Sequence, residues 1–431
     1  MQKKSIRYYL KWAKYNKCIN LFDTEWWKHE DLIEFQEYRL HKILKYAYKH
    51  VPGYRKKLKL AGIAPKHIRS LDDLRKLPII TREELQNNPD LVNEEMIYNT
   101  LYTGGSTGTS LQYYESHKSS EIRWNAHLRG WSWNGYQPGK RLAVVASAQG
   151  TLKVENTLNL YGDLTKENMH KNVEEIKKFN PQHLRGYVGS LYILAKFCLD
   201  NDIILEGIES INPISENLYD FQRETMEVAF NCPVFEEYCC NDGGACAWEC
   251  DAHEGLHYCM ERAIIEENGS EMVVTDLWNM AMPFIRYING DSVKFLNKKC
   301  SCGRDLPLIK VKGRDNDIII TKDGFLTPSF LVHHGIGIAT AIDNKNRFRS
   351  GIHAIQYVQK PGYVLEVNLV KNPWCNDDEI KELNEKLSII AAGMEIYIKI
   401  VDEIPKSKKG KRAFIINEDI DLLKKMKNLA Q

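Results

Sequence analysis

The chain has 431 residues, of which 43% are hydrophobic and 27% charged, a composition typical of a folded globular protein rather than a disordered one. Lys and Arg total 59 and Asp and Glu total 57, so the formal charge of +2 lacks the basic excess of proteins that bind nucleic acid non-specifically. No apolar run approaches the roughly 18 residues that a membrane span needs, and the basic N-terminus lacks the apolar core of a signal peptide. We therefore expect a cytoplasmic chain without a membrane span.

Helical spacing dominates the first hundred residues. Leu, Ile, Phe and Tyr recur every three or four residues within 31–60, which predicts an amphipathic helix that ends before Pro52. Ser70 and Thr81 are each placed to cap a short helix.

Strands and helices alternate beyond Gly108, and this alternation predicts an α/β body. The clearest examples are strands at 141–147 and 271–277 and helices at 167–179 and 189–200. The composition changes near 313–317, and the rest of the chain reads as a smaller α+β unit. Its predicted elements are strands near 353–360, 362–370 and 395–401, a helix at 377–392 and a basic loop at 405–412.

The segment Tyr102–Ser110 (YTGGSTGTS) is rich in Gly, Ser and Thr. Three glycines permit positive φ, and hydroxyl groups supply donors for anionic oxygens, so a loop that binds phosphate is one interpretation. A plain turn is the other. The segment is not a Walker A loop, because no Gly-Lys-Ser/Thr ends it.

Three further motifs follow along the chain. Residues 237–244 (EYCCNDGG) come after an apolar, strand-like 233–235, where a carboxylate at a strand end suits a ligand site and a simple turn fits equally well. The next motif combines 283–291 (PFIRYINGD) with 313–317 (GRDND). The last is the loop 405–412 (PKSKKGKR), which a solvated basic loop would also explain.

Cysteines are concentrated in one region, since eight of the eleven lie between Cys232 and Cys302. A disulfide framework is not expected in a chain without a secretory signal, so the cluster reads as packing residues or metal ligands. Cys/His pairs separated by about forty residues suit a tetrahedral Zn²⁺ site, and buried free thiols are the alternative. We expect core or pocket-wall roles for Cys239, Cys240, Cys246 and Cys259.

The order of the four motifs resembles that of the adenylate-forming superfamily of acyl-CoA synthetases. The most similar branch is that of phenylacetate–CoA ligase and the CapK-like proteins of capsular polysaccharide biosynthesis. The resemblance spans nearly the whole chain and begins with YAYKHVPGYRKKL and SLDDLRKLPIITREEL. It implies a large N-terminal adenylation domain of mixed sheets and helices over 1–315, and a small, mobile α+β domain over 316–431.

The resemblance also implies the roles of the residues that would handle ATP. In the phosphate loop these are Thr103, Ser106, Thr107, Gly108 and Thr109. The expected adenine wall consists of Ser215 and Glu216, which would open the helix before 233–235, and of Glu237 and Tyr238 at the strand end.

The remaining implied residues serve the reaction and the movement of the small domain. Asp242 matches the Mg²⁺ site, where the family usually has Glu, and Asp291 matches the ribose-binding Asp with Arg314 beside it. Asn316 stands where the family commonly has a hinge Asp or Lys, and Lys411 matches the catalytic lysine of the C-terminal loop.

The resemblance selects the zinc ligands as well, and it locates part of the acyl pocket. The ligands would be Cys250, His257, Cys300 and Cys302, with His253 as a rival to His257. The aromatic residues Trp124, Trp131, Trp133 and Tyr136 lie where the family builds its pocket, although their helical spacing favours core packing for most of them.

Three functions fit the sequence. The first is an ATP- and Mg²⁺-dependent, AMP-forming ligase that transfers the acyl group of a carboxylic acid to CoA. The second transfers it to an amine or hydroxyl, for example on a polysaccharide precursor. The third is a non-catalytic, zinc-stabilised binding protein, which the joint presence of Lys411, Asp291 and Arg314 disfavours. The acid, the acceptor and the oligomeric state are left open.

Overall fold

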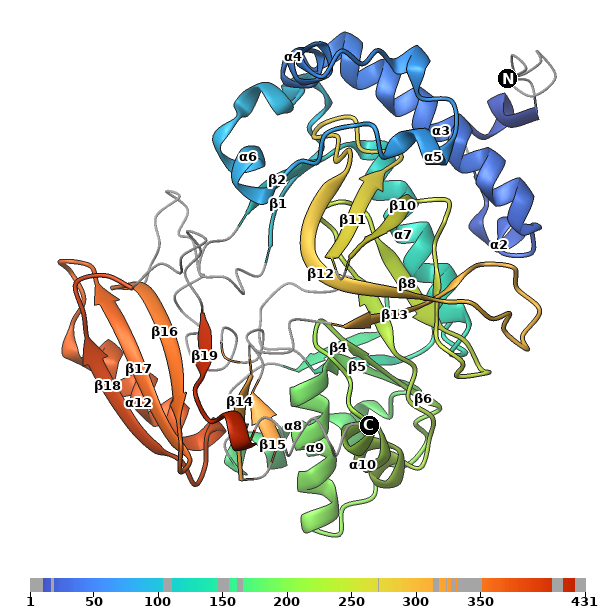
Figure 1. Cartoon of the computed structure of the whole chain (residues 1–431). Helices are drawn as coiled ribbons and strands as arrows, with labels where there is room; N and C mark the ends of the chain where they lie inside the picture. The colour runs from blue at the N-terminus through green and yellow to red at the C-terminus, as the bar shows by residue number, and fades with distance from the viewer. Residues whose placement is uncertain are drawn as a thin grey trace. The chain divides into compact units, whose positions relative to one another are not determined.

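The computed structural model describes residues 11–16, 19–103, 111–145, 155–160, 166–269, 271–312, 318–322, 324–326, 331, 351–404 and 414–422. The chain divides into two compact units (Figure 1). The first unit comprises Met1–Thr103, Leu111–Gln137 and Phe235–Gly313, and the second comprises Gly104–Ser110, Pro138–Val234 and Arg314–Gln431.

The helices of the first unit come before its large sheet in the sequence. They are α2 (Leu21–Thr24), α3 (His29–His50), α4 (Pro52–Leu60), α5 (Leu71–Leu74), α6 (Arg82–Asn87) and α7 (His117–Ser132). Short 3₁₀ turns cover Lys14–Asn16, Pro65–His67, Pro89–Leu91 and Glu94–Met96. The predicted break before Pro52 is confirmed, and the Ser70 and Thr81 side chains accept hydrogen bonds from the backbone N–H groups of Asp73 and Glu84.

The sheet of the first unit is antiparallel throughout. Its strand order is β10-β11-β12-β13-β9-β8-β7. The bounds are β7 (Glu237–Cys239), β8 (Cys246–Glu249), β9 (Leu256–Tyr258), β10 (Ala263–Asn268), β11 (Glu271–Asp276), β12 (Tyr287–Leu296) and β13 (Leu308–Lys312). A separate hairpin pairs β1 (Asn99–Tyr102) with β2 (Gln112–Glu115).

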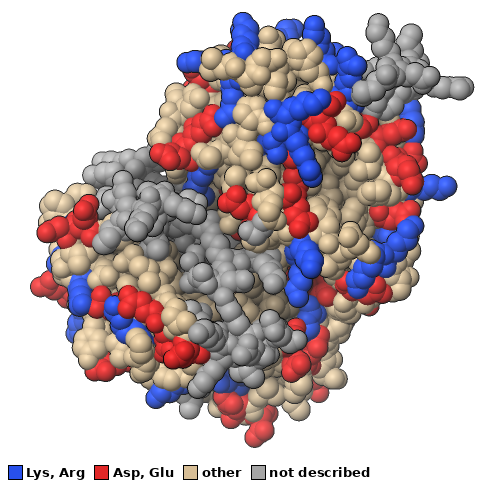
Figure 2. Space-filling view, viewed as in Figure 1, with Lys and Arg blue, Asp and Glu red and all other residues tan. Residues whose placement is uncertain are grey.

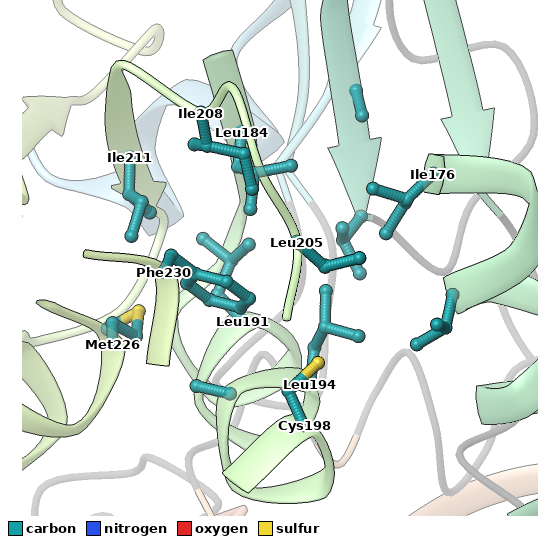
Figure 3. Packing of buried hydrophobic residues seen from close by; sticks show 14 of the residues in the cluster. Ile176, Leu184, Leu191, Leu194, Cys198, Leu205, Ile208, Ile211, Met226 and Phe230 are labelled. Carbon is teal, nitrogen blue, oxygen red and sulfur yellow. The ribbon is translucent and has the colours of Figure 1, made fainter. Parts of the chain in front are cut away.

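Residues 138–234 of the second unit form the predicted α/β arrangement. A parallel sheet of order β4-β3-β5-β6 contains β3 (Leu142–Val145), β4 (Thr157–Leu160), β5 (His183–Tyr187) and β6 (Ser210–Ile214). The helices are α8 (Lys166–Phe179), α9 (Val188–Asp200) and α10 (Asp220–Phe230). Figure 3 shows apolar side chains from these strands and helices meeting in one core, among them Leu184, Leu191, Leu194, Ile211 and Phe230.

The C-terminal part of the second unit is the predicted α+β fold. Its sheet has the order β18-β17-β16-β19, with an antiparallel central pair and a parallel strand on each side. The elements are β16 (Ile352–Lys360), β17 (Val364–Lys371), α12 (Asp377–Ile390), β18 (Glu395–Ile400) and β19 (Ile415–Asn417), with a hairpin of β14 (Ile319–Thr321) and β15 (Gly324–Leu326). Leu383 and Leu387 of α12 pack on Leu365, Val367 and Leu369 of β17 in the core.

Candidate functional site

Two residues predicted to contact the nucleoside lie in direct contact in the first unit. The hydroxyl of Tyr238 donates a hydrogen bond to Asp291 Oδ2 at 2.7 Å, and Asn289 Nδ2 approaches the same oxygen at 3.3 Å. Three strands separate β7 from β12 in the sheet order, and each strand spacing is about 4.8 Å. The sheet must therefore curl strongly to bring Tyr238 to Asp291.

Asp242 is buried close to these residues. Its Oδ2 accepts a hydrogen bond from the Tyr287 hydroxyl at 3.0 Å, and its Oδ1 accepts one from the Cys240 thiol at 3.1 Å. Burial raises the pKa of Asp242, and these hydrogen bonds oppose the rise. Both carboxylate oxygens already accept hydrogen bonds, so binding Mg²⁺ directly would require one of them to be released.

The two glycines after Asp242 fix the path of this loop. Gly243 and Gly244 both have positive φ, which side chains rarely adopt. A Cβ at Gly243 would lie 2.3 Å from Val274, and one at Gly244 would lie 2.6 Å from Asp276. The loop therefore presses against β11, and this contact holds Asp242 in place.

Thr103, the first residue of the predicted phosphate contacts, is held by Arg82, a residue that belongs to none of the sequence motifs. Arg82 NH2 donates to Thr103 Oγ1 at 2.7 Å, and the backbone N–H of Leu111 donates to the same oxygen at 2.9 Å. The positive charge of Arg82 also lowers the pKa of Asp242, against the effect of burial. In the sequence, Arg82 looks like an ordinary first residue of a helix.

The local structure predicted for the adenine wall is wrong at two places. Ser215 and Glu216 lie in the loop after β6 and do not open α10, which begins at Asp220. Glu216 instead accepts a hydrogen bond at 2.7 Å from the backbone N–H of Gly189, where α9 begins, because an acidic side chain is favoured at a helix N-terminus.

Glu237 begins strand β7 rather than following a strand. Residues 233–235 form only an isolated bridge, between Val234 and Ile211, because proline at 233 lacks the N–H that a continuous ladder needs. The carboxylate of Glu237 accepts a hydrogen bond from Trp131 Nε1 at 3.0 Å. The predicted contact of Glu237 with adenine stays a prediction.

Several predicted residues lie outside the described part of the chain. They are Ser106, Thr107, Gly108, Thr109, Arg314, Asn316 and Lys411. Their roles rest on the sequence.

The four predicted zinc ligands come together in the first unit. Cys250 follows β8, His257 lies in β9, and Cys300 and Cys302 lie between β12 and β13. One ligand atom of each residue lies within 4.8 Å of the other three. The Sγ atoms of Cys250 and Cys300 are 3.6 Å apart, and His257 Nε2 lies 3.3 Å from Cys302 Sγ.

His257 presents its Nε2 to this group in the form that a metal needs. Its Nδ1–H donates to the carbonyl of Leu306 at 3.1 Å, and burial lowers the pKa of His257 to about 4, so the imidazole is neutral at pH 7. The rival, His253, is not among the four: its Nδ1 lies 3.3 Å from Glu249 Oε1 and its ring packs on Phe235.

The predicted aromatic residues are mainly core residues. Trp131, Trp133 and Tyr136 are buried, whereas Trp124, which lies on α7 with Trp131, is 38% exposed. Cys246 and Cys259 are fully buried, as expected for packing residues, and Cys239 and Cys240 are half-buried.

Known proteins similar to this chain were found both by sequence and by structure. Residues 331–418 match the CapK C-terminal domain. The chain is 25% identical over 422 residues to protein CapK of Staphylococcus aureus, covering 90% of this chain and 89% of that protein. It is 22% identical to phenylacetate-coenzyme A ligase of Thermus thermophilus, with coverage of 68% and 72%. In structure it is similar to 2-hydroxyisobutyryl-CoA ligase in complex with 2-HIB-AMP and CoA, with a TM-score of 0.65, 17% identity and 94% coverage of both chains.

The chain thus has homologues in CapK and phenylacetate-coenzyme A ligase, and the solved structures similar to it include adenylate-forming CoA ligases. Its mixed α/β architecture is that of adenylate-forming CoA ligases. Among the described residues, none of the helices is both long and apolar enough to span a bilayer. Basic and acidic side chains are interspersed on the face shown in Figure 2, in keeping with the formal net charge of +2.

Proposed function

We propose that the protein is an ATP-dependent, AMP-forming ligase that activates a carboxylic acid and passes the acyl group to an acceptor, with CoA as the first candidate. The observation that carries this proposal is the pairing of Tyr238 with Asp291 beside the buried Asp242. The sequence independently predicts a place at the nucleotide site for all three residues. The similarity to phenylacetate-coenzyme A ligase supports the same reaction class.

The chemistry explains the residue types at this site. A carboxylate oxygen attacks the α-phosphorus of ATP, the bond to pyrophosphate breaks, and an acyl-AMP results. Both reactants are anions, so positive charge must be placed beside them, and Lys411 and Arg82 are the candidates among the side chains. Bound Mg²⁺ would add further charge neutralisation, with Asp242 as its candidate ligand.

The acceptor distinguishes the remaining alternatives. An acid–thiol ligase would release AMP over many turnovers only when CoA is added, whereas an acid–amine or acid–alcohol ligase would do so with amino acids or amino sugars. The relative named CapK motivates the second group of acceptors. A screen that measures AMP release with each class separates these enzymes, and no AMP with any acid would favour the non-catalytic binding protein.

The test of the adenylation step is Lys411→Ala, with Lys408→Ala in the same basic loop as the matched control. We expect the first variant to lower acid-dependent exchange of pyrophosphate into ATP by roughly 10²-fold, the effect of losing one pre-placed charge at a transition state. The control should retain most of the activity. Equal activity of both variants would contradict the role of Lys411.

We also propose that Cys250, His257, Cys300 and Cys302 hold one structural Zn²⁺. Three thiolates and one neutral imidazole are the donors that zinc prefers, and four protein ligands leave no open position for a substrate. The ion would connect the ends of β8 and β9 to the turn before β13, and its contribution would be to folding rather than to chemistry.

A further inference from the structure

His127 of α7 lies between a carboxylate and a thiol of strand β7. Glu237 and Cys239 are the first and last residues of that strand, so their side chains point to the same face. His127 Nδ1 lies 3.5 Å from Glu237 Oε1, and His127 Nε2 lies 3.7 Å from Cys239 Sγ. The imidazole therefore connects the acid to the thiol, with one ring nitrogen facing each.

In the series Glu237–His127–Cys239, the Glu237 carboxylate is held in place and shielded from water. Trp131 Nε1 donates to Glu237 Oε2 at 3.0 Å. Glu237 and His127 are only 6% and 7% exposed, whereas Cys239 is half-buried. Cys239 is therefore the least buried residue of the three.

The groups around Cys239 favour its thiolate form. Cys246 is its cross-strand neighbour, and Arg262 NH1 donates to Cys239 Sγ at 3.8 Å. A hydrogen bond from the Cys246 thiol, with the charges of His127 and Arg262, outweighs burial and lowers the pKa of Cys239 well below its usual range. Burial alone would lower the pKa of His127, but Cys239 and Glu237 outweigh it and raise that pKa. A thiolate beside an imidazolium is the reactive form of a cysteine nucleophile.

A metal site is the main competing interpretation. One ligand atom from each of His127, Glu237 and Cys239 lies within 4.8 Å of the other two, which is close enough for a bound cation. However, Glu237 and Cys239 approach opposite nitrogens of the imidazole. A single ion binds only one nitrogen of an imidazole ring, so it would not explain both approaches. The arrangement matches a nucleophile, a base and an acid that orients the base.

We infer that Cys239 is a catalytic nucleophile that takes the acyl group from the acyl-adenylate as a thioester, with His127 as its base and Glu237 as the positioning residue. The inference rests on the adenylation reaction proposed above. Cys239 directly follows Tyr238, which pairs with Asp291 at the predicted nucleoside site, and consecutive side chains of β7 point to opposite faces. The inference therefore places the nucleoside on the face of Tyr238 and the acyl end of the adenylate on the face of Cys239.

The step balances without a further reactant. The Cys239 sulfur forms a bond to the acyl carbon, the bond from that carbon to the phosphate oxygen breaks, and AMP leaves with the electron pair. The thiol proton stays on His127 Nε2, where Glu237 stabilises the imidazolium. An acceptor amine, hydroxyl or thiol then attacks the thioester, the carbon–sulfur bond breaks and the thiolate returns, while the acceptor proton passes to solvent.

The first experiment needs no adenylation. The full-length protein is treated with p-nitrophenyl acetate, and acetylation of each cysteine is followed by peptide mass spectrometry. We expect acetyl transfer to Cys239 in the wild type, none at this position in Cys239→Ser, and a rate lower by about 10²-fold in His127→Asn. Cys375 is the internal reference, because it is half-buried but burial raises the pKa of its thiol. Thermal unfolding of both variants serves as the control that each is folded.

A second experiment adds ATP, Mg²⁺ and a pool of carboxylic acids. A thioester on Cys239 in the wild type, with acyl-AMP alone in Cys239→Ser, supports the inference. Acetylation of Cys239 by the ester but no AMP with any acid supports the nucleophile and contradicts the adenylation proposal. Three results would overturn the inference: no acetylation of Cys239, an equal rate in His127→Asn, or two zinc ions per chain that fall to one in Cys239→Ser.

Discussion

The zinc proposal depends on individual ligand residues. We expect one Zn²⁺ per chain in elemental analysis of the purified protein. Cys300→Ser should release the ion and lower the thermal midpoint, because structural zinc contributes directly to the free energy of folding. His253→Asn is the matched control, since His253 pairs with Glu249 instead of facing the cluster, and it should keep the zinc. A metal-free wild type of undiminished stability would sink the proposal.

At the scale of single residues, a functional role is predictable from the sequence only where the residue types themselves indicate the chemistry. Cysteine and histidine at paired spacing indicated a metal site, and the structure brings all four ligands within reach of one another. Arg82 carried no such signal, because its contact with Thr103 joins residues whose proximity depends on the tertiary fold. The resemblance assigns Glu237 to the adenine wall, but its carboxylate accepts a hydrogen bond from Trp131, a contact between α7 and β7 that sequence spacing does not reveal.

Single elements were easier to predict than their assembly. The helix limits at Pro52 and the caps at Ser70 and Thr81 depend on local chemistry, and each is confirmed. The α/β alternation correctly described the parallel sheet of 138–234 but not the antiparallel sheet that contains β7–β13. Strands such as β8 and β9 are buried on both faces, so they lack the alternation of exposed and buried residues, and their pairing direction is not encoded locally.

One position on α7 tests how closely that helix packs on the sheet. Gly130 faces Trp248 of β8, and a Cβ at this position would lie 2.2 Å from the indole. Alanine normally stabilises a helix relative to glycine by about 1 kcal/mol, but here overpacking should dominate and lower the free energy of unfolding by about 1–3 kcal/mol. Asn125→Ala at an exposed position of the same helix should be neutral or stabilising. Urea titrations that show Gly130→Ala to be stabilising would contradict this packing.

At the scale of the whole molecule, the compact units do not follow the order of the chain. The first unit is assembled from three separate segments, and 138–234 belongs with 314–431 in the second. Sequence composition detects a change only where the chain continues into a different kind of segment, as it does near 313–317. It does not detect a segment that returns to an earlier unit. The division into domains 1–315 and 316–431 therefore stays a proposal about which part moves during the reaction.

That movement can be tested at Asn316. A two-step ligase must place Lys411 over the phosphates for adenylation and then withdraw it to admit the acceptor, so the hinge residue needs backbone freedom, which Asn provides more readily than most residues. Asn316→Pro would fix φ near about −65° and disfavour the helical region for Asp315. We expect it to leave substantial formation of acyl-AMP while transfer to the acceptor falls much further, and Asn316→Gly should support both steps. Separate rates for the two half-reactions decide the matter: equal losses in the proline variant would indicate general damage to the fold, and full retention of both would place the hinge elsewhere.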